Sequence, residues 1–93
     1  MKVITFYRKA DPPVLCKGYL YEFMGLRLVI FKPYYNSHWW YVAEYSTGCG
    51  LAAAAETRNH AVANARSCLD RQGSLRICQA VNQVIQESGL LNF

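Results

Sequence analysis

Residues 37–70 read SHWWYVAEYSTGCGLAAAAETRNHAVANARSCLD and join an aromatic segment to an alanine-rich amphipathic segment. The aromatic and β-branched residues at positions 39–45 predict a strand, and Ser46-Thr47-Gly48 predicts a turn after it. Side chains alternate between the two faces of a strand, so we expect one face to carry Trp40, Val42 and Glu44 and the other Trp39, Tyr41, Ala43 and Tyr45. Both faces carry bulky side chains, which indicates that helices cover at least one of them.

Three further strands are expected before this segment. The first spans residues 3–7 and ends at Asp11-Pro12-Pro13, because proline cannot continue a sheet ladder. The second begins at Val14 or Lys17 and runs to residue 23, and Gly25 makes the turn into a third strand at residues 26–31. In the third strand we expect Leu26, Leu28 and Ile30 on one face and Arg27, Val29 and Phe31 on the other. Residues 32–37 are expected to form a loop.

The chain after the aromatic strand predicts a turn, a short segment and two helices. Residues 51–55 return as a fifth strand or, because alanine favours helices, begin the first helix early. Thr57 or Asn59 caps that helix and Gly73 ends it, and a second helix runs from Ser74 to near Gly89. We expect an aromatic sheet face to pack beneath the small residues Ala61, Ala63 and Ala65, and the buried side of the second helix to be Leu75, Ile77, Cys78, Val81, Val84 and Ile85.

These elements predict an α+β fold, with an antiparallel sheet of four or five strands followed by two helices packed on one face. The hydrophobic content of 53% allows a real core, and residues 1–93 are expected to form a single domain. An unpaired edge at the first or fifth strand would support a homodimer.

Charge and cysteine usage limit the function classes. The formal net charge of +4 is spread along the chain without a basic run, which indicates a mild field that can steer an anionic partner. The amino-terminal apolar run is far too short for a signal peptide or a membrane span, so we expect a cytoplasmic protein with no membrane contact. Cys16, Cys49, Cys68 and Cys78 lack zinc spacing and are expected to be reduced, with Cys68 and Cys78 the only pairing worth checking.

The sequence contains no recognisable catalytic constellation, and we expect a non-enzymatic protein with no metal and no cofactor. His38 and His60 are expected at the surface or in packing roles, and Gly48-Cys49-Gly50 lacks the residues of a phosphate-binding loop. Glu44 is either a buried acid or, more simply, an outward residue or a partner of Arg58. An enzyme would need an unseen pocket that combines Glu44 with His38 or Cys49.

An aromatic and basic cluster is the strongest candidate for a binding surface. It consists of Tyr34, Tyr35, Trp39, Trp40, Tyr41 and Tyr45 with Lys32, Arg58 and Arg66 near them. Such side chains serve as core, as hot spots for a protein partner or as stacking platforms for nucleic acid. The residues expected to contact a partner are Tyr34, Tyr35, Trp39, Tyr41, Arg58 and Arg66.

The pattern Trp40-x-Val42-x-Glu44-x-x-Thr47-Gly48, followed by Thr57-Arg58 and by alanines on a helix, resembles small proteins encoded by bacterial phages and other mobile elements. In size and architecture the chain is similar to anti-CRISPR inhibitors, which occupy a surface of a nucleic-acid-handling effector. A weaker similarity is to antitoxin domains. The resemblance implies a phage protein that occludes a surface of a protein partner, such as a bacterial immune effector of the CRISPR type. The alternative is a nucleic-acid-binding module that uses the aromatic and basic sheet surface.

Overall fold

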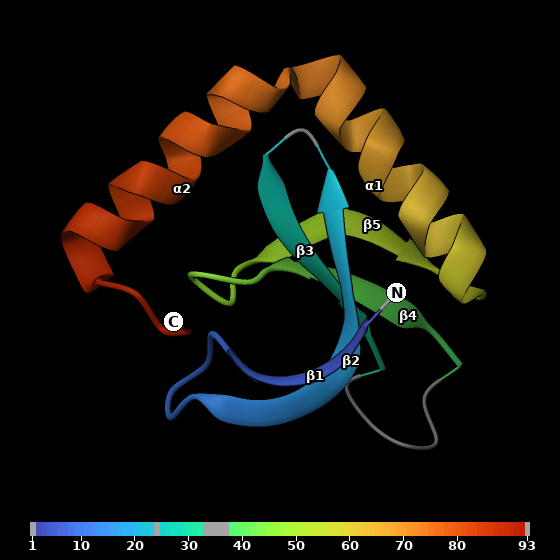
Figure 1. The fold of residues 1–93 in the computed structure, drawn as a ribbon, viewed down its shortest axis with the longest axis horizontal. Helices are drawn as coiled ribbons and strands as arrows, with labels where there is room; N and C mark the ends of the chain where they lie inside the picture. Colours follow the sequence, from blue (N-terminus) through green and yellow to red (C-terminus); the bar gives the residue numbers. More distant parts are fainter. Residues whose placement is uncertain (1, 24, 33–37, 93) are drawn as a thin grey trace.

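The computed structural model describes residues 2–23, 25–32 and 38–92. Five strands precede two helices in the chain (Figure 1). The elements are β1 (Lys2–Arg8), β2 (Val14–Phe23), β3 (Leu26–Phe31), β4 (Trp40–Glu44), β5 (Gly50–Ala55), α1 (Arg58–Gln72) and α2 (Ser74–Ser88). The predicted α+β class is therefore confirmed, and the open choice at residues 51–55 is settled in favour of a strand.

The strands form one antiparallel sheet in chain order, β1-β2-β3-β4-β5, and each strand pairs with the next along the chain. The β4–β5 pair is irregular, because Trp40 lies opposite Ala55 whereas Val42 lies opposite Leu51. The alanine run therefore contains a bulge. Small side chains tolerate the local change in twist that a bulge brings.

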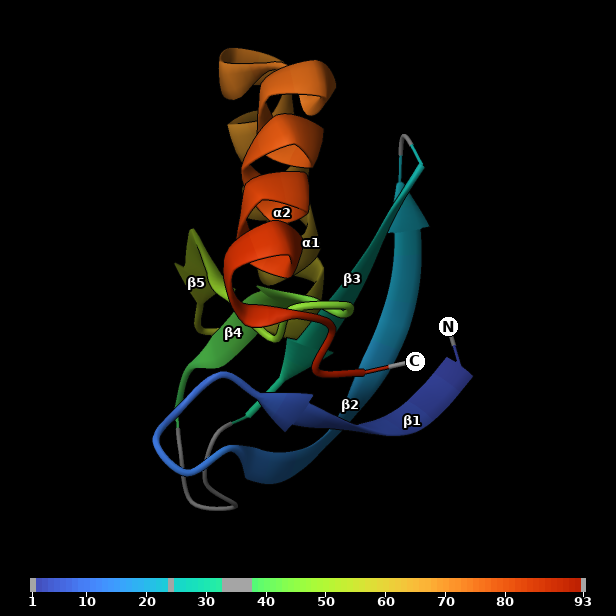
Figure 2. The same cartoon turned by 90° about the vertical axis from the view of Figure 1, so that its left-hand side faces the viewer.

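The sheet curls, and the two helices cover only its outer side (Figures 1 and 2). Inside the curl lies a cluster of buried side chains: Phe6, Cys16, Val29, Phe31 and Ala43. A second cluster joins the outer face to the helices: Leu26, Leu28, Ile30, Val42, Ala53, Ala55, Ala61, Ala65, Leu69 and Ile77. The alternation predicted for β3 and β4 is confirmed, since Leu28 and Val42 belong to one cluster and Val29 and Ala43 to the other.

Helix α1 begins and ends as its sequence predicts. The Thr57 side chain accepts a hydrogen bond from the His60 N–H at 3.1 Å, so Thr57 rather than Asn59 is the N-cap. The helix ends at Gly73, whose φ of 81° is in the region that glycine adopts without strain. Its alanines pack less uniformly than predicted, because Ala61 and Ala65 are buried whereas Ala63 is exposed.

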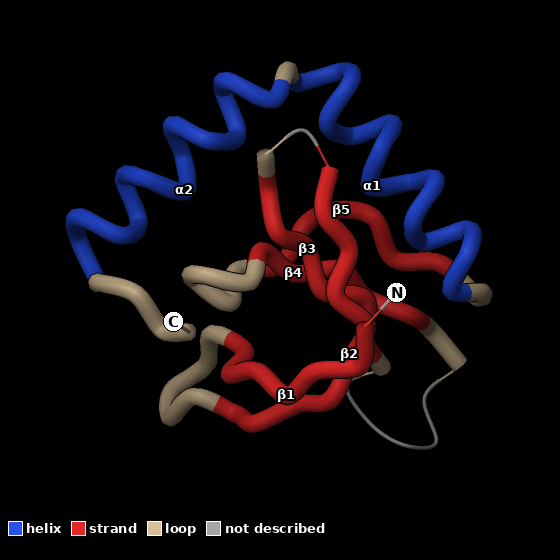
Figure 3. The backbone as a smooth tube through the Cα atoms, in the orientation of Figure 1, coloured by secondary structure: helices blue, strands red, loops and turns tan. Residues whose placement is uncertain are grey.

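One expectation about the helix layer is confirmed in part and another is wrong. The rings of Tyr21, Phe23 and Trp40 pack, partly buried, against the cluster that contains Ala61 and Ala65, although most of the fully buried side chains there are aliphatic. Leu75, predicted on the buried side of α2, is 72% exposed. The physical reason is that Leu75 lies in the first turn of α2, next to the short break at Gly73 where the chain changes direction between the two helices (Figures 1 and 3).

The carboxy-terminal residues close the curled sheet at one end. Asn92, which is buried, accepts a hydrogen bond from the Tyr7 N–H at 2.6 Å and donates to the carbonyls of Tyr7 and Tyr45 at 2.9 and 2.7 Å. The Lys9 N–H also donates to the Gly48 carbonyl at 3.0 Å. One amide side chain thus joins the end of β1 to the turn after β4, where the strands themselves do not pair.

Candidate partner-binding surface

Beside α1, the outer face of the sheet carries two aromatic rings, Tyr19 on β2 and Trp40 on β4, and a cationic side chain lies over each ring. The Arg58 guanidinium lies 4.4 Å from the centre of the Tyr19 ring, and the Lys32 ammonium lies 5.0 Å from the Trp40 ring. The Tyr19 and Trp40 rings are themselves 6.1 Å apart. We call Lys17, Tyr19, Lys32, Trp40 and Arg58 the cation–aromatic patch. Further along β2, the centre of the Phe23 ring lies 4.9 Å from the guanidinium of Arg66, which belongs to α1.

Sheet register explains why these residues meet. The β2–β3 pairing ends at Gly18 and Phe31, and Lys17 and Lys32 are the residues that follow this pair on the two chain segments. Like charges that lie close together repel each other, and an anion that binds between them relieves the repulsion. These two lysines line a hollow of about 200 Å³ together with Val3, Gly18, Tyr19 and Trp40, and none of these described lining residues carries a carboxylate.

Gly18 is essential to this arrangement. A Cβ atom at this position would lie 2.7 Å from a methyl group of Val29 and 2.8 Å from the Ile30 carbonyl oxygen. The close approach of β2 to β3 at this point thus requires glycine.

The residues predicted to contact a partner do not form one group. Tyr34 and Tyr35 lie outside the described residues. Trp39 and Tyr41 are 46% and 40% exposed, but the Tyr41 ring lies 6.2 Å from that of Phe31, on the inner face of the sheet. The remaining two, Arg58 and Arg66, lie on the outer face.

Sequence reasoning missed the β2 residues Lys17 and Tyr19. Both precede the aromatic segment by about twenty positions, and only strand pairing brings them beside it. A signal was present, because Lys17, Tyr19, Tyr21 and Phe23 alternate along β2 and so share a face.

Glu44 is a buried acid, which was one of the two alternatives, and its prediction as an outward residue or a partner of Arg58 is wrong. The side chain is 3% exposed. One carboxylate oxygen accepts the Ser46 N–H at 2.9 Å, and the other accepts the N–H and hydroxyl of Thr47 at 2.8 and 2.7 Å. These bonds fold the β4–β5 turn back over the carboxylate, and Arg58 contacts Tyr19 instead.

Two of the other catalytic candidates lie together and the histidines lie apart from them. Glu44 and Cys49 both line a hollow of about 220 Å³ beneath α2, and neither His38 nor His60 is among its described lining residues. The four thiols are free, with Cys16 and Cys68 buried. Within the described ranges, no cluster of three histidine, cysteine, aspartate or glutamate side chains could hold a metal ion.

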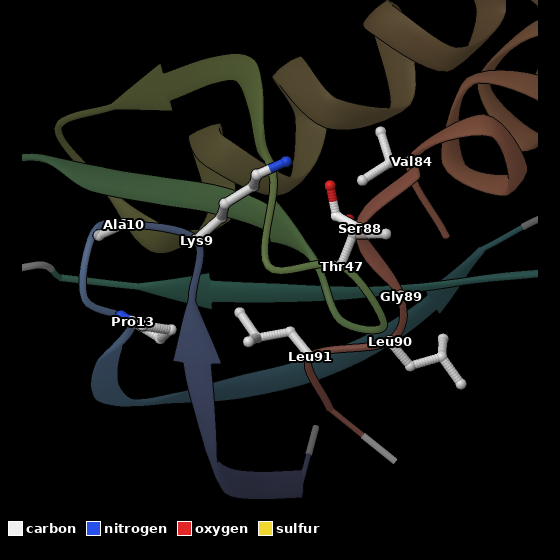
Figure 4. A pocket seen from close by; sticks show the side chains of 9 residues that line it. All are labelled: Lys9, Ala10, Pro13, Thr47, Val84, Ser88, Gly89, Leu90 and Leu91. Atoms are coloured by element: carbon white, nitrogen blue, oxygen red, sulfur yellow. The ribbon is translucent and has the colours of Figure 1, made fainter. Parts of the chain in front are cut away.

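A third hollow lies where the chain closes on itself. It measures about 160 Å³ and is formed by the β1–β2 connection, the β4–β5 turn and the end of α2 (Figure 4). Apolar side chains such as Leu91 and Val84 line most of it, and Lys9 and Ser88 supply polar groups. Its position beside Asn92 indicates a packing seam.

Neither helix in the described ranges is long and apolar enough to cross a bilayer. No family model, curated protein or solved structure matches the chain. We therefore infer a function from the chemistry of the surface residues alone.

Proposed function

We propose that this protein is a non-enzymatic binding protein that occludes an acidic surface of a protein partner with its cation–aromatic patch. The observation that supports it best is the set of cations held over rings around a hollow without a carboxylate. Tyrosine, tryptophan and arginine are also the residues that dominate protein–protein hot spots. Identification of the partner as a bacterial immune effector rests on the resemblance described above and stays a prediction.

The cation–ring contacts favour a carboxylate-bearing partner. A carboxylate can pair with Arg58 or Lys32 while the cation remains on its ring. A nucleic-acid base that stacks on the same ring face must first displace the cation, at a cost of about 0.5–1 kcal/mol per ring at an exposed site. A ring also holds the long cationic side chain in place, which lowers the entropy that binding must remove.

The test compares two pairs of alanine variants against a partner isolated by affinity capture. Lys32→Ala combined with Arg58→Ala should raise the Kd by about tenfold or more, because both residues belong to the patch. The matched control combines Arg71→Ala with Arg76→Ala, which removes the same charge at the far end of α1 and the start of α2. This control should stay within about twofold of the wild-type Kd. Equal losses in the two pairs would mean that net charge, and not this patch, drives binding.

A nucleic-acid-binding module is the second candidate. The adjacent Lys17 and Lys32 are the observation that favours it, because a phosphate could bridge them. Affinity for a single-stranded oligonucleotide that falls steeply as salt rises would support this alternative. Absence of oligonucleotide binding at low salt would exclude it.

A further inference from the structure

β1 is an outer strand of the sheet, and Tyr7 shows which way its main-chain groups point. Both the N–H and the C=O of Tyr7 bond to Asn92, on the side away from β2. In an antiparallel ladder, alternate residues point these groups to the same side. Val3 and Thr5 therefore direct their N–H and C=O outward too, and among the described residues none bonds to those groups.

The Asn92 side chain occupies the place of a neighbouring strand. Its amide oxygen accepts from the Tyr7 N–H and its amide nitrogen donates to the Tyr7 carbonyl, which are the two bonds that a paired peptide strand would make. The edge is therefore competent for pairing, and Asn92 fills only its last position. The open portion runs from Lys2 to Thr5, where Val3 is 50% exposed.

The charge along this open edge is mostly positive. β1 carries Lys2 and Arg8 and no aspartate or glutamate, and Lys17 lies next to Thr5 on β2. The one acid of β2, Glu22, lies beyond the β1–β2 pairing, which ends at Lys2 and Leu20. A second copy that paired through this edge would bring two sets of these cations together. An extended segment rich in carboxylates would instead be attracted to this edge, because its carboxylates can pair with the cations.

We propose that the open edge of β1 binds an extended acidic segment of a partner protein as a sixth strand. Main-chain bonds to Val3 and Thr5 supply affinity, and carboxylates beside Lys17, on the face of the sheet that Val3 and Thr5 share, supply selectivity. This goes beyond the function proposed above, because it concerns main-chain pairing at a different surface. The two surfaces adjoin, since Val3 also lines the hollow of the cation–aromatic patch.

The experiment uses the whole chain and a peptide of alternating valine and glutamate, matched in length to β1. Binding is measured by fluorescence anisotropy, and amide hydrogen exchange is followed by NMR. At saturating peptide, exchange at the Val3 and Thr5 amides should slow by about tenfold or more, because a bonded amide exchanges only when the pairing opens. A peptide of alternating valine and lysine should not bind.

Two substitutions at one position isolate the main-chain contribution. Thr5→Pro removes an outward N–H without removing a bond to β2, and we expect affinity to fall by about fivefold to tenfold. Thr5→Val keeps the N–H and should bind like the wild type. If the proline variant does not fold, Lys17→Glu takes its place and should lower the affinity for the acidic peptide by a similar factor.

Three results would overturn the proposal. The first is unchanged exchange at Val3 and Thr5 in the presence of bound peptide. The second is equal binding by the proline and valine variants. The third is a concentration-dependent dimer in sedimentation experiments that Thr5→Pro abolishes, which would assign the edge to a second copy of the chain. Arg58→Ala should leave peptide binding intact, so failure of the cation–aromatic patch and failure of this edge are distinguishable.

Discussion

Replacement of Asn92 by alanine should destabilise the fold far more than its place next to the chain end suggests. The side chain makes three hydrogen bonds, of 2.6, 2.9 and 2.7 Å, to main-chain groups of Tyr7 and Tyr45. Each contributes about 1 kcal/mol net, so the loss is about 3 kcal/mol, reduced to about 2–3 kcal/mol because water reaches the partly buried acceptors. In a domain of this size, that corresponds to a fall in Tm of about 10–20 °C.

The assay is thermal unfolding by calorimetry, with urea unfolding as a second measure of the free energy of unfolding. Asn82→Ala is the matched control, because Asn82 is exposed on α2 and should change stability by less than about 0.5 kcal/mol. Asn92→Asp should be at least as harmful as the alanine variant, since a carboxylate cannot donate to the two carbonyls. A loss below about 0.5 kcal/mol in Asn92→Ala would refute the view that this amide closes the sheet.

Three more substitutions test the packing, each measured by urea unfolding beside a control. Gly48→Ala should cost at least about 2 kcal/mol, because its φ is +70° and its Cβ would lie 2.5 Å from the Tyr7 carbonyl oxygen, whereas Gly25→Ala meets nothing within 4 Å and should cost only the backbone strain. Ala65→Leu should cost about 1–3 kcal/mol by overfilling the core, and Ala63→Leu should be nearly neutral, so equal effects would contradict the helix orientation. Glu44→Ala should cost about 2–4 kcal/mol by leaving the Ser46 and Thr47 amides without their acceptor, against little change in exposed Glu87→Ala.

Local signals predicted the elements well because they act over a few residues. Proline pairs, glycines and the Thr57 cap mark element ends through dihedral limits and short-range hydrogen bonds, and those limits hold whatever the chain later contacts. Two-residue alternation likewise assigned the faces of β3 and β4 correctly. The candidate site fared differently, because Lys17 and Tyr19 join it through register alone.

The amino-acid sequence by itself determined the order of the first four strands and the two helices, their approximate ends and the alternation of side chains along β3 and β4, whereas it left residues 51–55 open between a fifth strand and an early start of the first helix. Tertiary structure alone decided that Lys17 and Lys32 line one hollow, that Glu44 binds its own turn and that Asn92 occupies the last position of the β1 edge. The reason is the range of the forces involved. Dihedral preference and side-chain alternation depend on neighbours in the chain, whereas pairing register and the satisfaction of buried polar groups depend on residues that meet only when the sheet has curled.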